Sequence, residues 1–418
     1  MAIFTVCYLY QYVFMFLSFI LEPRDRKKRE ARRDLPPTGN RYAVLICGRN
    51  EENVIGDLID CLKAQDYEGE ITTFVMADNC DDSTADIARR HGAVVYERHN
   101  TELIGKGYAM DVLMKNIARD YPDSFDGFFV FDADNLLPAD FISQMDKMIA
   151  EGWEVLTGYR NAKNYGDSWI SASNGLWYMR ENRFMNHTRS MLGLSSTITG
   201  TGFYFSKRIA DELGGWPYHS LTEDTEFSAD IITRGNRIGY CPEAVVYDEQ
   251  TTTLRQSWRQ RLRWSRGYLQ VLKLKGWKLL KGLFEPNFSC YDMIMSIAPA
   301  FALSTITTAV NILTYIVIIA TGGDIAKVLV ALAQMLFGMY NTMFLIGLLA
   351  CISEWKKIRA SSFKKILSII VLPIFMLTYI PIAMEALFVK PVWKPITHTV
   401  TKEQLNARAD EEKLPAAE

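Results

Sequence analysis

Residues 127–134 read GFFVFDAD, an apolar run that ends in two aspartates separated by one residue. A short and continuously apolar run predicts a strand that is buried on both faces of a sheet. Asp132 and Asp134 then lie at the carboxyl end of that strand, where open α/β sheets bind their ligands. Paired carboxylates suit a hard divalent cation, although an aspartate pair at this position also caps helices.

Three more apolar runs precede this one and extend the pattern. They are YAVLIC (42–47), ITTFVMAD (71–78) and AVVYER (93–98), and a helical pattern follows each of them. This alternation predicts an α/β fold with an open, mostly parallel, Rossmann-like sheet and helices on both faces, which we assign to residues 42–253. No GxGxxG motif follows the first run, which argues against a dinucleotide-binding version of the fold.

Further polar residues occur where such a sheet would present them to a ligand. Asp78 ends the second predicted strand, and Glu223 and Asp224 lie in the turn-like segment HSLTEDTEF. Downstream, QRLRW contains Gln260, Arg263 and Trp264 in a Q-x-x-R-W spacing. An arginine offers a charged fork for a diphosphate, and a tryptophan offers a flat apolar surface on which a sugar ring can stack. Each motif is weak alone, and their order along the chain is far more specific.

Composition excludes several classes of protein. The chain has 418 residues and a formal net charge of −2, which gives no support for nucleic acid as a partner. Its seven cysteines form no CxxC pair, which argues against a disulfide framework and against a zinc site. His187, His219 and His398 stand alone in the sequence, which indicates structural or surface roles.

The apolar residues concentrate in segments that are long enough to cross a lipid bilayer. Residues 1–22 contain an uncharged stretch, and RDRKKREARR follows it, so we expect a transmembrane anchor and then a basic cytoplasmic linker over 23–41. Residues 286–390 contain three more stretches, at about 290–320, 325–352 and 366–389, of which Pro373 and Pro381 interrupt the last. We therefore expect a multi-pass protein of the plasma membrane with its α/β domain in the cytoplasm and a polar tail over 391–418.

Residues 254–285 combine basic side chains with tryptophans and leucines, and no acidic residue occurs between Thr253 and Phe284. This composition at helical spacing predicts an amphipathic helix in the membrane interface. The alternative is a solvated basic face of the α/β domain. We favour the interfacial helix because it directly precedes the apolar stretches and carries tryptophans.

The ordered motifs resemble a known family. RNEE, VMADNCDDST, GKGYAM, DAD, GTGFYFSKR, GGWPYHSLTEDTEF and QRLRW are similar to those of the membrane-bound, processive, inverting family 2 glycosyltransferases, which include cellulose, hyaluronan, chitin and poly-N-acetylglucosamine synthases. The resemblance implies a nucleotide-diphospho-sugar transferase domain, a UDP-sugar donor, and Mg²⁺ or Mn²⁺ as cofactor. It covers roughly residues 42–270 by motif and the remainder by membrane layout.

The resemblance also implies roles for individual residues. On the donor side these are Asn50, Glu51 and Asp78 for the uridine, Lys106 for the phosphates, Asp134 as the metal ligand, and Asp132 for the metal and the nucleotide. On the acceptor side they are Asp224 with Glu223 as the general base, the turn Gly200, Thr201 and Gly202 near the acceptor, and Gln260, Arg263 and Trp264 for the pyrophosphate and the acceptor end.

Two acceptors remain open at this stage. The first expectation is a synthase that extends a β-linked polysaccharide from a donor of the UDP-glucose or UDP-N-acetylglucosamine type and exports it. The alternative is a non-processive transferase that adds one sugar to a membrane lipid. An export channel needs more spans than this chain offers, and an accessory membrane subunit could supply them. A catalytically silent scaffold is a third interpretation, against which the intact Asp134, Asp224 and Q-x-x-R-W residues argue.

Overall fold

The structure, a computed structural model, describes residues 2–285, 287–298, 300–322, 324–389, 391 and 398–405. Its centre is a seven-stranded sheet with the order β3-β2-β1-β4-β6-β5-β7, in which β6 runs antiparallel to its two neighbours. The strands are β1 (Arg41–Gly48), β2 (Glu70–Asp78), β3 (Val94–Arg98), β4 (Gly127–Phe131), β5 (Val155–Ala162), β6 (Phe203–Ser206) and β7 (Gly239–Asp248). The predicted α/β fold with a mostly parallel sheet is therefore confirmed, and its first four strands lie where the apolar runs placed them.

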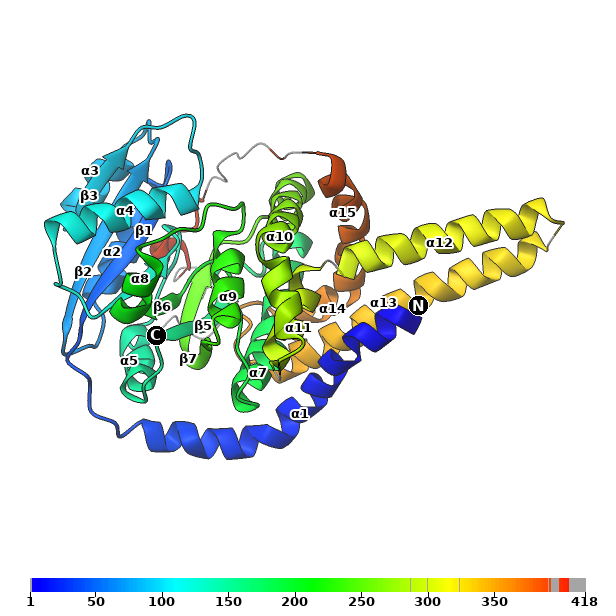
Figure 1. Cartoon of the computed structure of the whole chain (residues 1–418), viewed down its shortest axis with the longest axis horizontal. Helices are drawn as coiled ribbons and strands as arrows, with labels where there is room; N and C mark the ends of the chain where they lie inside the picture. Colours follow the sequence, from blue (N-terminus) through cyan, green and yellow to red (C-terminus); the bar gives the residue numbers. More distant parts are fainter. Residues whose placement is uncertain are drawn as a thin grey trace.

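Alternating side chains of the central strand β1 build the two layers of the core. Tyr42, Val44 and Ile46 point into one cluster, together with α2 (Ile55–Lys63) and α5 (Phe141–Ala150). Ala43 and Leu45 point into the other, together with α4 (Lys106–Asp120), α8 (Lys207–Leu213) and α9 (Glu223–Thr233). The short helix α3 (Thr84–Arg90) lies beside β3 (Figure 1). Because helices cover both faces, the central strands β1 and β4 are buried along nearly their whole length instead of alternating.

The chain between β5 and β6 joins this domain to the apolar helices. It forms α6 (Trp169–Arg180), the π-helical turn η1 (Glu181–Asn186) and α7 (His187–Met191). Leu176 of α6 is fully buried in a cluster with Met15, Ile346 and Leu372, which come from three apolar helices. The α/β domain and the apolar helices therefore share a core.

Among the described residues, three helical segments are long and apolar enough to cross a membrane, judged by length and composition. They are Val6–Arg32 in α1 (Ala2–Arg32), Ile325–Ser353, which is α13, and Ser362–Phe388, which comprises α14 (Ser362–Leu377) and α15 (Tyr379–Phe388). With α12 (Ala300–Ala320), α13 forms a hairpin that projects away from the rest of the molecule (Figure 1).

Two boundaries differ from the sequence-based expectation. The stretch expected at 290–320 contains two helices, because α11 (Phe288–Ile297) packs against the α/β domain before α12 begins. The basic stretch after residue 22, which was expected to be a separate linker over 23–41, continues α1 as helix up to Arg32. Arg29 holds this extension in place through ion pairs with Glu22, Asp25 and Glu243.

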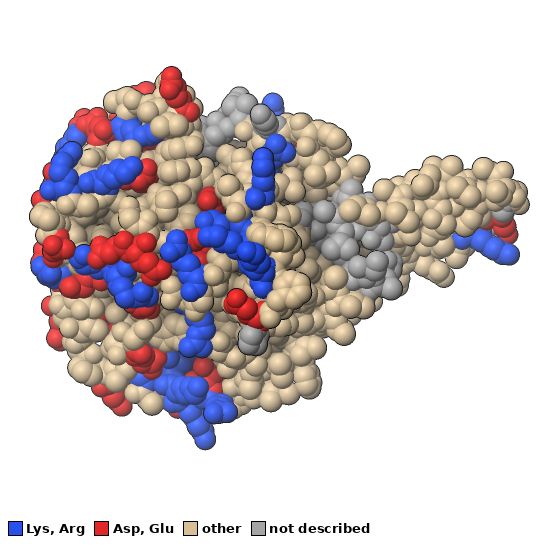
Figure 2. Space-filling view, in the orientation of Figure 1, with Lys and Arg blue, Asp and Glu red and all other residues tan. Residues whose placement is uncertain are grey.

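The helix α10 (Leu254–Gly282) has the amphipathic character that its sequence predicts. Trp277 is 71% exposed and Leu274 is 57% exposed, and the exposed lysines Lys273, Lys278 and Lys281 alternate with them. Figure 2 shows that lysine and arginine side chains gather on the body of the molecule, whereas the hairpin of α12 and α13 carries charge only near its tip. This distribution is the one expected where a charged body meets an apolar membrane segment.

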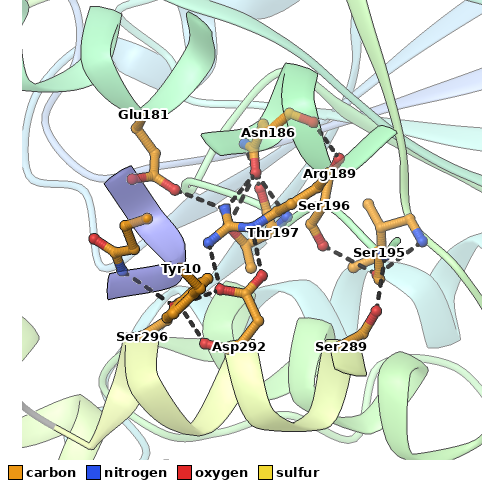
Figure 3. A network of polar contacts seen from close by, with 12 residues as sticks. Tyr10, Glu181, Asn186, Arg189, Ser195, Ser196, Thr197, Ser289, Asp292 and Ser296 are labelled. Carbon is orange, nitrogen blue, oxygen red and sulfur yellow. Dashed lines mark hydrogen bonds and ion pairs between the residues drawn. The ribbon is translucent and has the colours of Figure 1, made fainter. Parts of the chain in front are cut away.

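A buried ion pair links α7 to α11 and α1 (Figure 3). The Arg189 guanidinium donates to both carboxylate oxygens of Asp292, at 2.6 and 3.0 Å, and to Glu181 at 2.8 Å. The Tyr10 hydroxyl of α1 donates to the same Asp292 carboxylate at 2.8 Å. Arg189 and Asp292 are each 1% exposed, so their charges depend almost entirely on each other and on these neighbours.

Removing one charge of this pair should destabilise the protein strongly. We expect Arg189→Met to lower the free energy of unfolding by about 3–5 kcal/mol, because Asp292 stays buried without its counter-charge. The double variant Arg189→Met, Asp292→Met should recover most of that loss, since Arg180 remains paired with Glu181. Thermal unfolding of the detergent-solubilised protein measures the loss in the single variant and the recovery in the double variant. Lys207→Met, at the exposed pair with Asp211, is the control and should change little. A double variant as unstable as Arg189→Met would contradict this account.

Candidate active site

A cavity of about 780 Å³ opens at the carboxyl edge of the sheet and continues toward the apolar helices. The ends of several strands contribute charged side chains to its wall, because parallel strands bring their carboxyl ends to one edge. Among the lining residues are Glu51, Asp78, Lys106, Asp132, Asp134, Arg160, Gly200, Glu223, Asp224, Asp248, Glu249, Gln260, Arg263, Trp264 and His398. The edge therefore unites most of the residues that the sequence singled out.

Asp132 follows β4 and faces the first residue of α4. The Lys106 ammonium forms an ion pair with the Asp132 carboxylate and donates to the Gly200 carbonyl at 2.9 Å. The Asp132 backbone N–H donates to the Thr201 hydroxyl at 3.0 Å, and that hydroxyl donates to Asn135. Lys106 thus connects the carboxylate after β4 to the turn before β6.

Asp134 is held from the other side. Its carboxylate accepts the Glu249 backbone N–H at 2.7 Å, and Lys163 donates to its carbonyl at 2.8 Å. Burial pushes the pKa of Asp134 up, but the nearby positive charges of His398 and Lys163 outweigh it and keep the pKa below its usual value. Asp134 is therefore a buried, ionised carboxylate.

Glu223 and Asp224 begin α9, beside the turn that contains Gly200. Gly200 has a φ of +95°, and a side chain there would approach the Asp224 carboxylate to 3.8 Å. Burial, followed by the neighbouring charge of Asp224, raises the pKa of Glu223 to about 7. Burial also raises the pKa of Asp224, although the Thr225 N–H, Lys106 and Arg263 oppose this. A carboxylate with a raised pKa is a stronger base near neutral pH.

The Q-x-x-R-W residues lie on α10, on the side that faces the cavity. Arg263 donates to the Leu221 carbonyl at 2.8 Å and so fixes the loop that precedes α9. The side-chain carbonyl of Gln260 is buried and has no hydrogen-bond partner among the residues described. Because buried polar atoms normally have a partner, this oxygen is available to a ligand.

Three of the predicted residues lie outside the cavity wall. Asn50 has a φ of +59°, does not line the cavity, and exchanges hydrogen bonds with Asp81. Thr201 and Gly202 are also absent from the wall, since Thr201 supports Asp132 from behind and Gly202 packs against Val246. Asp78 does line the cavity, where it forms an ion pair with Arg98.

His398 was expected to be structural or at the surface, and the structure places it in the cavity. Its Nδ1 lies 2.9 Å from the Glu51 carboxylate. Burial alone would lower the pKa of His398, but the carboxylates of Asp134, Glu51 and Glu249 raise it to about 10. Within the tail expected to be polar, residues 398–405 thus return to the α/β domain, and the Val400 carbonyl accepts from Lys163 at 2.8 Å. Most of the remaining tail lies outside the described residues.

Arg160 and Lys163 were also missed by the sequence analysis. Arg160 forms an ion pair with Asp248 and donates to the Thr199 carbonyl, which precedes Gly200. Both basic residues come from TGYRNAKN, the end of a strand that the sequence analysis did not assign. The sequence feature that could have identified them is the presence of two basic residues at the end of an otherwise apolar run.

Asp132 and Asp134 suit a divalent cation whose remaining ligands are phosphate oxygens of a substrate. The negative charges of Asp134 and Asp132 add to burial in raising the pKa of Glu51, which His398 opposes. Within the part of the chain that the structure describes, no three acidic, histidine or cysteine side chains are grouped closely enough to hold an ion by themselves. Mg²⁺ is often held by one or two carboxylates and completed by substrate phosphates, and Asp132 and Asp134 suit that arrangement.

The fold and the cavity define a membrane-associated α/β domain with an acidic ligand site at the carboxyl edge of its sheet. The chain belongs to the family described as Glycosyltransferase like family 2, whose model matches residues 37–267.

Relatives in this family have different products. The chain is 26% identical over 290 residues to a probable glycosyltransferase, YdaM, of Bacillus subtilis, covering 63% of this chain and 65% of that protein. It is 23% identical over 278 residues to the beta-monoglucosyldiacylglycerol synthase of a Synechocystis species, covering 61% and 57%. It is 25% identical over 239 residues to the poly-beta-1,6-N-acetyl-D-glucosamine synthase of Staphylococcus aureus, covering 54% of each. The chain thus spans less than two thirds of the length of these relatives.

The raised pKa of Glu223 predicts a dependence of stability on pH. From the usual value of 4.5 up to about 7, the folded protein keeps a proton that the unfolded chain releases, so this group favours folding less as the pH rises. Glu223→Gln removes the ionisation. We therefore expect the variant to gain melting temperature relative to the natural protein at pH 8, and to gain less at pH 5.

Differential scanning fluorimetry between pH 5 and pH 8 measures this difference. Glu102→Gln, at an exposed glutamate, is the matched control and should show the same melting temperature as the natural protein at both pH values. A Glu223→Gln effect that is the same at both pH values would argue against a raised pKa.

Proposed function

We propose that the protein is an inverting, cation-dependent transferase that moves a hexose or N-acetylhexosamine from a UDP-sugar to an acceptor hydroxyl. The observation that carries the proposal is the single cavity that Asp132, Asp134, Asp224, Gln260 and Arg263 share. It provides acidic and basic groups for a diphosphate at the sheet edge and a buried base beside them.

Asp224 is the base in this scheme. An acceptor hydroxyl is a poor nucleophile, so a carboxylate must take its proton as the bond to the anomeric carbon forms. The bond between that carbon and the UDP oxygen breaks in the same step, which inverts the configuration from an α-linked donor to a β-linked product. Burial raises the pKa of Asp224 and so strengthens it as a base. When Glu223 is ionised, it places a second negative charge beside Asp224.

The leaving UDP develops negative charge on its diphosphate. Lys106 and Arg263 line the cavity and would stabilise that charge. Asp132 and Asp134 would hold Mg²⁺ or Mn²⁺, which when bound supplies further positive charge to the diphosphate. Asp78 and Glu51, at the far side of the edge, would contact the uridine. Asn50 would act indirectly, through the loop that contains Asp81.

Location follows from the same features. The apolar segments support a multi-pass membrane protein, and the basic stretch after residue 22 supports a cytoplasmic α/β domain at the plasma membrane. A cytoplasmic domain would draw on nucleotide sugars that are made there. The relatives include a polysaccharide synthase and a glycolipid synthase. Either a growing polysaccharide, with an accessory subunit for export, or a membrane lipid therefore remains compatible with family membership.

UDP release by the purified, detergent-solubilised protein tests the proposal. UDP-glucose, UDP-N-acetylglucosamine, UDP-galactose and UDP-glucuronate are offered in turn with Mg²⁺ or Mn²⁺. We expect release with one donor, its loss in EDTA, and a fall of about 10²–10⁴-fold in Asp224→Asn, which is the usual contribution of a general base.

Asp211→Asn is the matched control, since Asp211 is an exposed aspartate away from the cavity. It should release UDP at the natural rate. Full activity in Asp224→Asn would exclude Asp224 as the base, and full activity in EDTA would exclude the cation.

A further inference from the structure

The cavity has a second end, which the donor chemistry does not use. Beyond Asp224 it continues between the apolar helices α11 and α13 and the junction of α14 with α15. The wall at this end is mostly apolar and rich in methionine, and it includes Met293, Met295, Met335, Met339, Met343 and Ile346. Methionine side chains are flexible and fill irregular apolar space, so such a wall adapts to chains without a fixed shape.

Between the two ends, α6 supplies a short polar section. Asn174 and Arg180 line the cavity and are 3% and 6% exposed. The Asn174 amide nitrogen and the Arg180 Nε have no hydrogen-bond partner among the described residues, although each is fully buried. Trp177 lines the cavity beside them, with its ring 4.7 Å from the Arg180 guanidinium. Unpaired donors beside an aromatic ring form a site for a group that accepts hydrogen bonds.

The charges of this section are already balanced. Arg180 forms an ion pair with Glu181 at 2.8 Å and also donates to Gln11 of α1. Arg189 is paired with Asp292 and with the same Glu181. These two arginines therefore leave no surplus positive charge for a phosphate group, and the remaining donors suit neutral oxygens such as those of an ester or a hydroxyl.

We propose that this end of the cavity holds the acceptor, a membrane lipid with an uncharged, hydroxyl-bearing head group of the diacylglycerol type. Its acyl chains would lie along the methionine-rich face of α13, its ester oxygens near Asn174 and Arg180, and its free hydroxyl toward Asp224. This assignment rests on the proposed function, in which Asp224 activates the acceptor hydroxyl.

The polarity of the wall distinguishes this acceptor from a polysaccharide. A sugar polymer carries hydroxyl groups along its whole length, and each one that leaves water needs a hydrogen-bond partner. Thioethers and aliphatic groups predominate among the residues that line the far end, and polar side chains such as Gln11, Asn311 and Thr342 are scattered between them. An acyl chain has no such requirement, and burying it in this wall is favourable.

Photo-crosslinking tests occupancy without relying on turnover. The full chain in lipid nanodiscs receives a dioleoylglycerol analogue with a diazirine in one acyl chain, and mass spectrometry locates the labelled residues. We expect labelling of Met335, Met339 or Met343 that excess dioleoylglycerol removes and that chitotetraose and polyprenyl phosphate leave unchanged. Labelling confined to the outward face of α13, around the exposed Leu345, would overturn the proposal. Competition by polyprenyl phosphate alone would overturn the uncharged head group.

A pair of variants adds a functional readout. Met339→Trp fills the apolar end, and Leu345→Trp places the same bulk on an exposed position of the same helix. With dioleoylglycerol as acceptor we expect Met339→Trp to raise the acceptor KM by about tenfold or more, whereas Leu345→Trp stays within about twofold. Sugar transferred to chitotetraose, with both variants equal to the natural protein, would overturn the proposal.

The two proposals fail in different ways. In one outcome, dioleoylglycerol competes with labelling of the α13 methionines, but no donor yields UDP. This outcome would contradict the proposed transfer and still support the lipid site. UDP release that needs Asp224, together with labelling that dioleoylglycerol does not compete, would support the transferase and overturn the lipid acceptor.

Discussion

The buried pair of Arg189 and Asp292 is the interaction on which the arrangement of this molecule depends. It joins a helix that leaves the α/β domain to α11, the first helix after α10, and Tyr10 adds α1 to the same point. A buried ion pair is weak evidence of net stability, but its geometry is demanding, because both charges lose most of their solvation when they separate. The pair therefore fixes where the apolar helices stand relative to the sheet, and with them the two halves of the cavity wall.

The acidic end of the cavity depends on a related constraint. Carboxylates brought together at one sheet edge repel each other, and the chain offsets this with basic groups from distant segments. Lys106 forms an ion pair with Asp132, Arg160 with Asp248, and His398 with Glu51. Lys106 and Arg160 also donate to the backbone carbonyls of Gly200 and Thr199, so the same contacts that balance charge hold the turn before β6. The basic side chains therefore both neutralise the carboxylates and fix the backbone around the site.

Much of this organisation could be predicted from the sequence. The four apolar runs give four of the seven strands, and the carboxyl-edge rule then brings Asp78, Asp132 and Asp134 to one edge. Side-chain direction could not be predicted, because the left-handed backbone at Asn50 turns its amide toward Asp81. His398 was missed for a different reason. It lies 347 positions from its partner Glu51, and a lone histidine gives no local pattern.

The position of residues 398–400 has a consequence for the synthesis of the chain. These residues follow the last apolar helix, and yet they contact Glu51, Lys163 and Glu249 of the α/β domain. On the ribosome, the domain leaves the exit tunnel long before they do, so its acidic edge remains incomplete until the helices between them have been inserted. A partly made chain would therefore lack His398 in the cavity wall and the backbone contacts of residues 399 and 400 with Glu249.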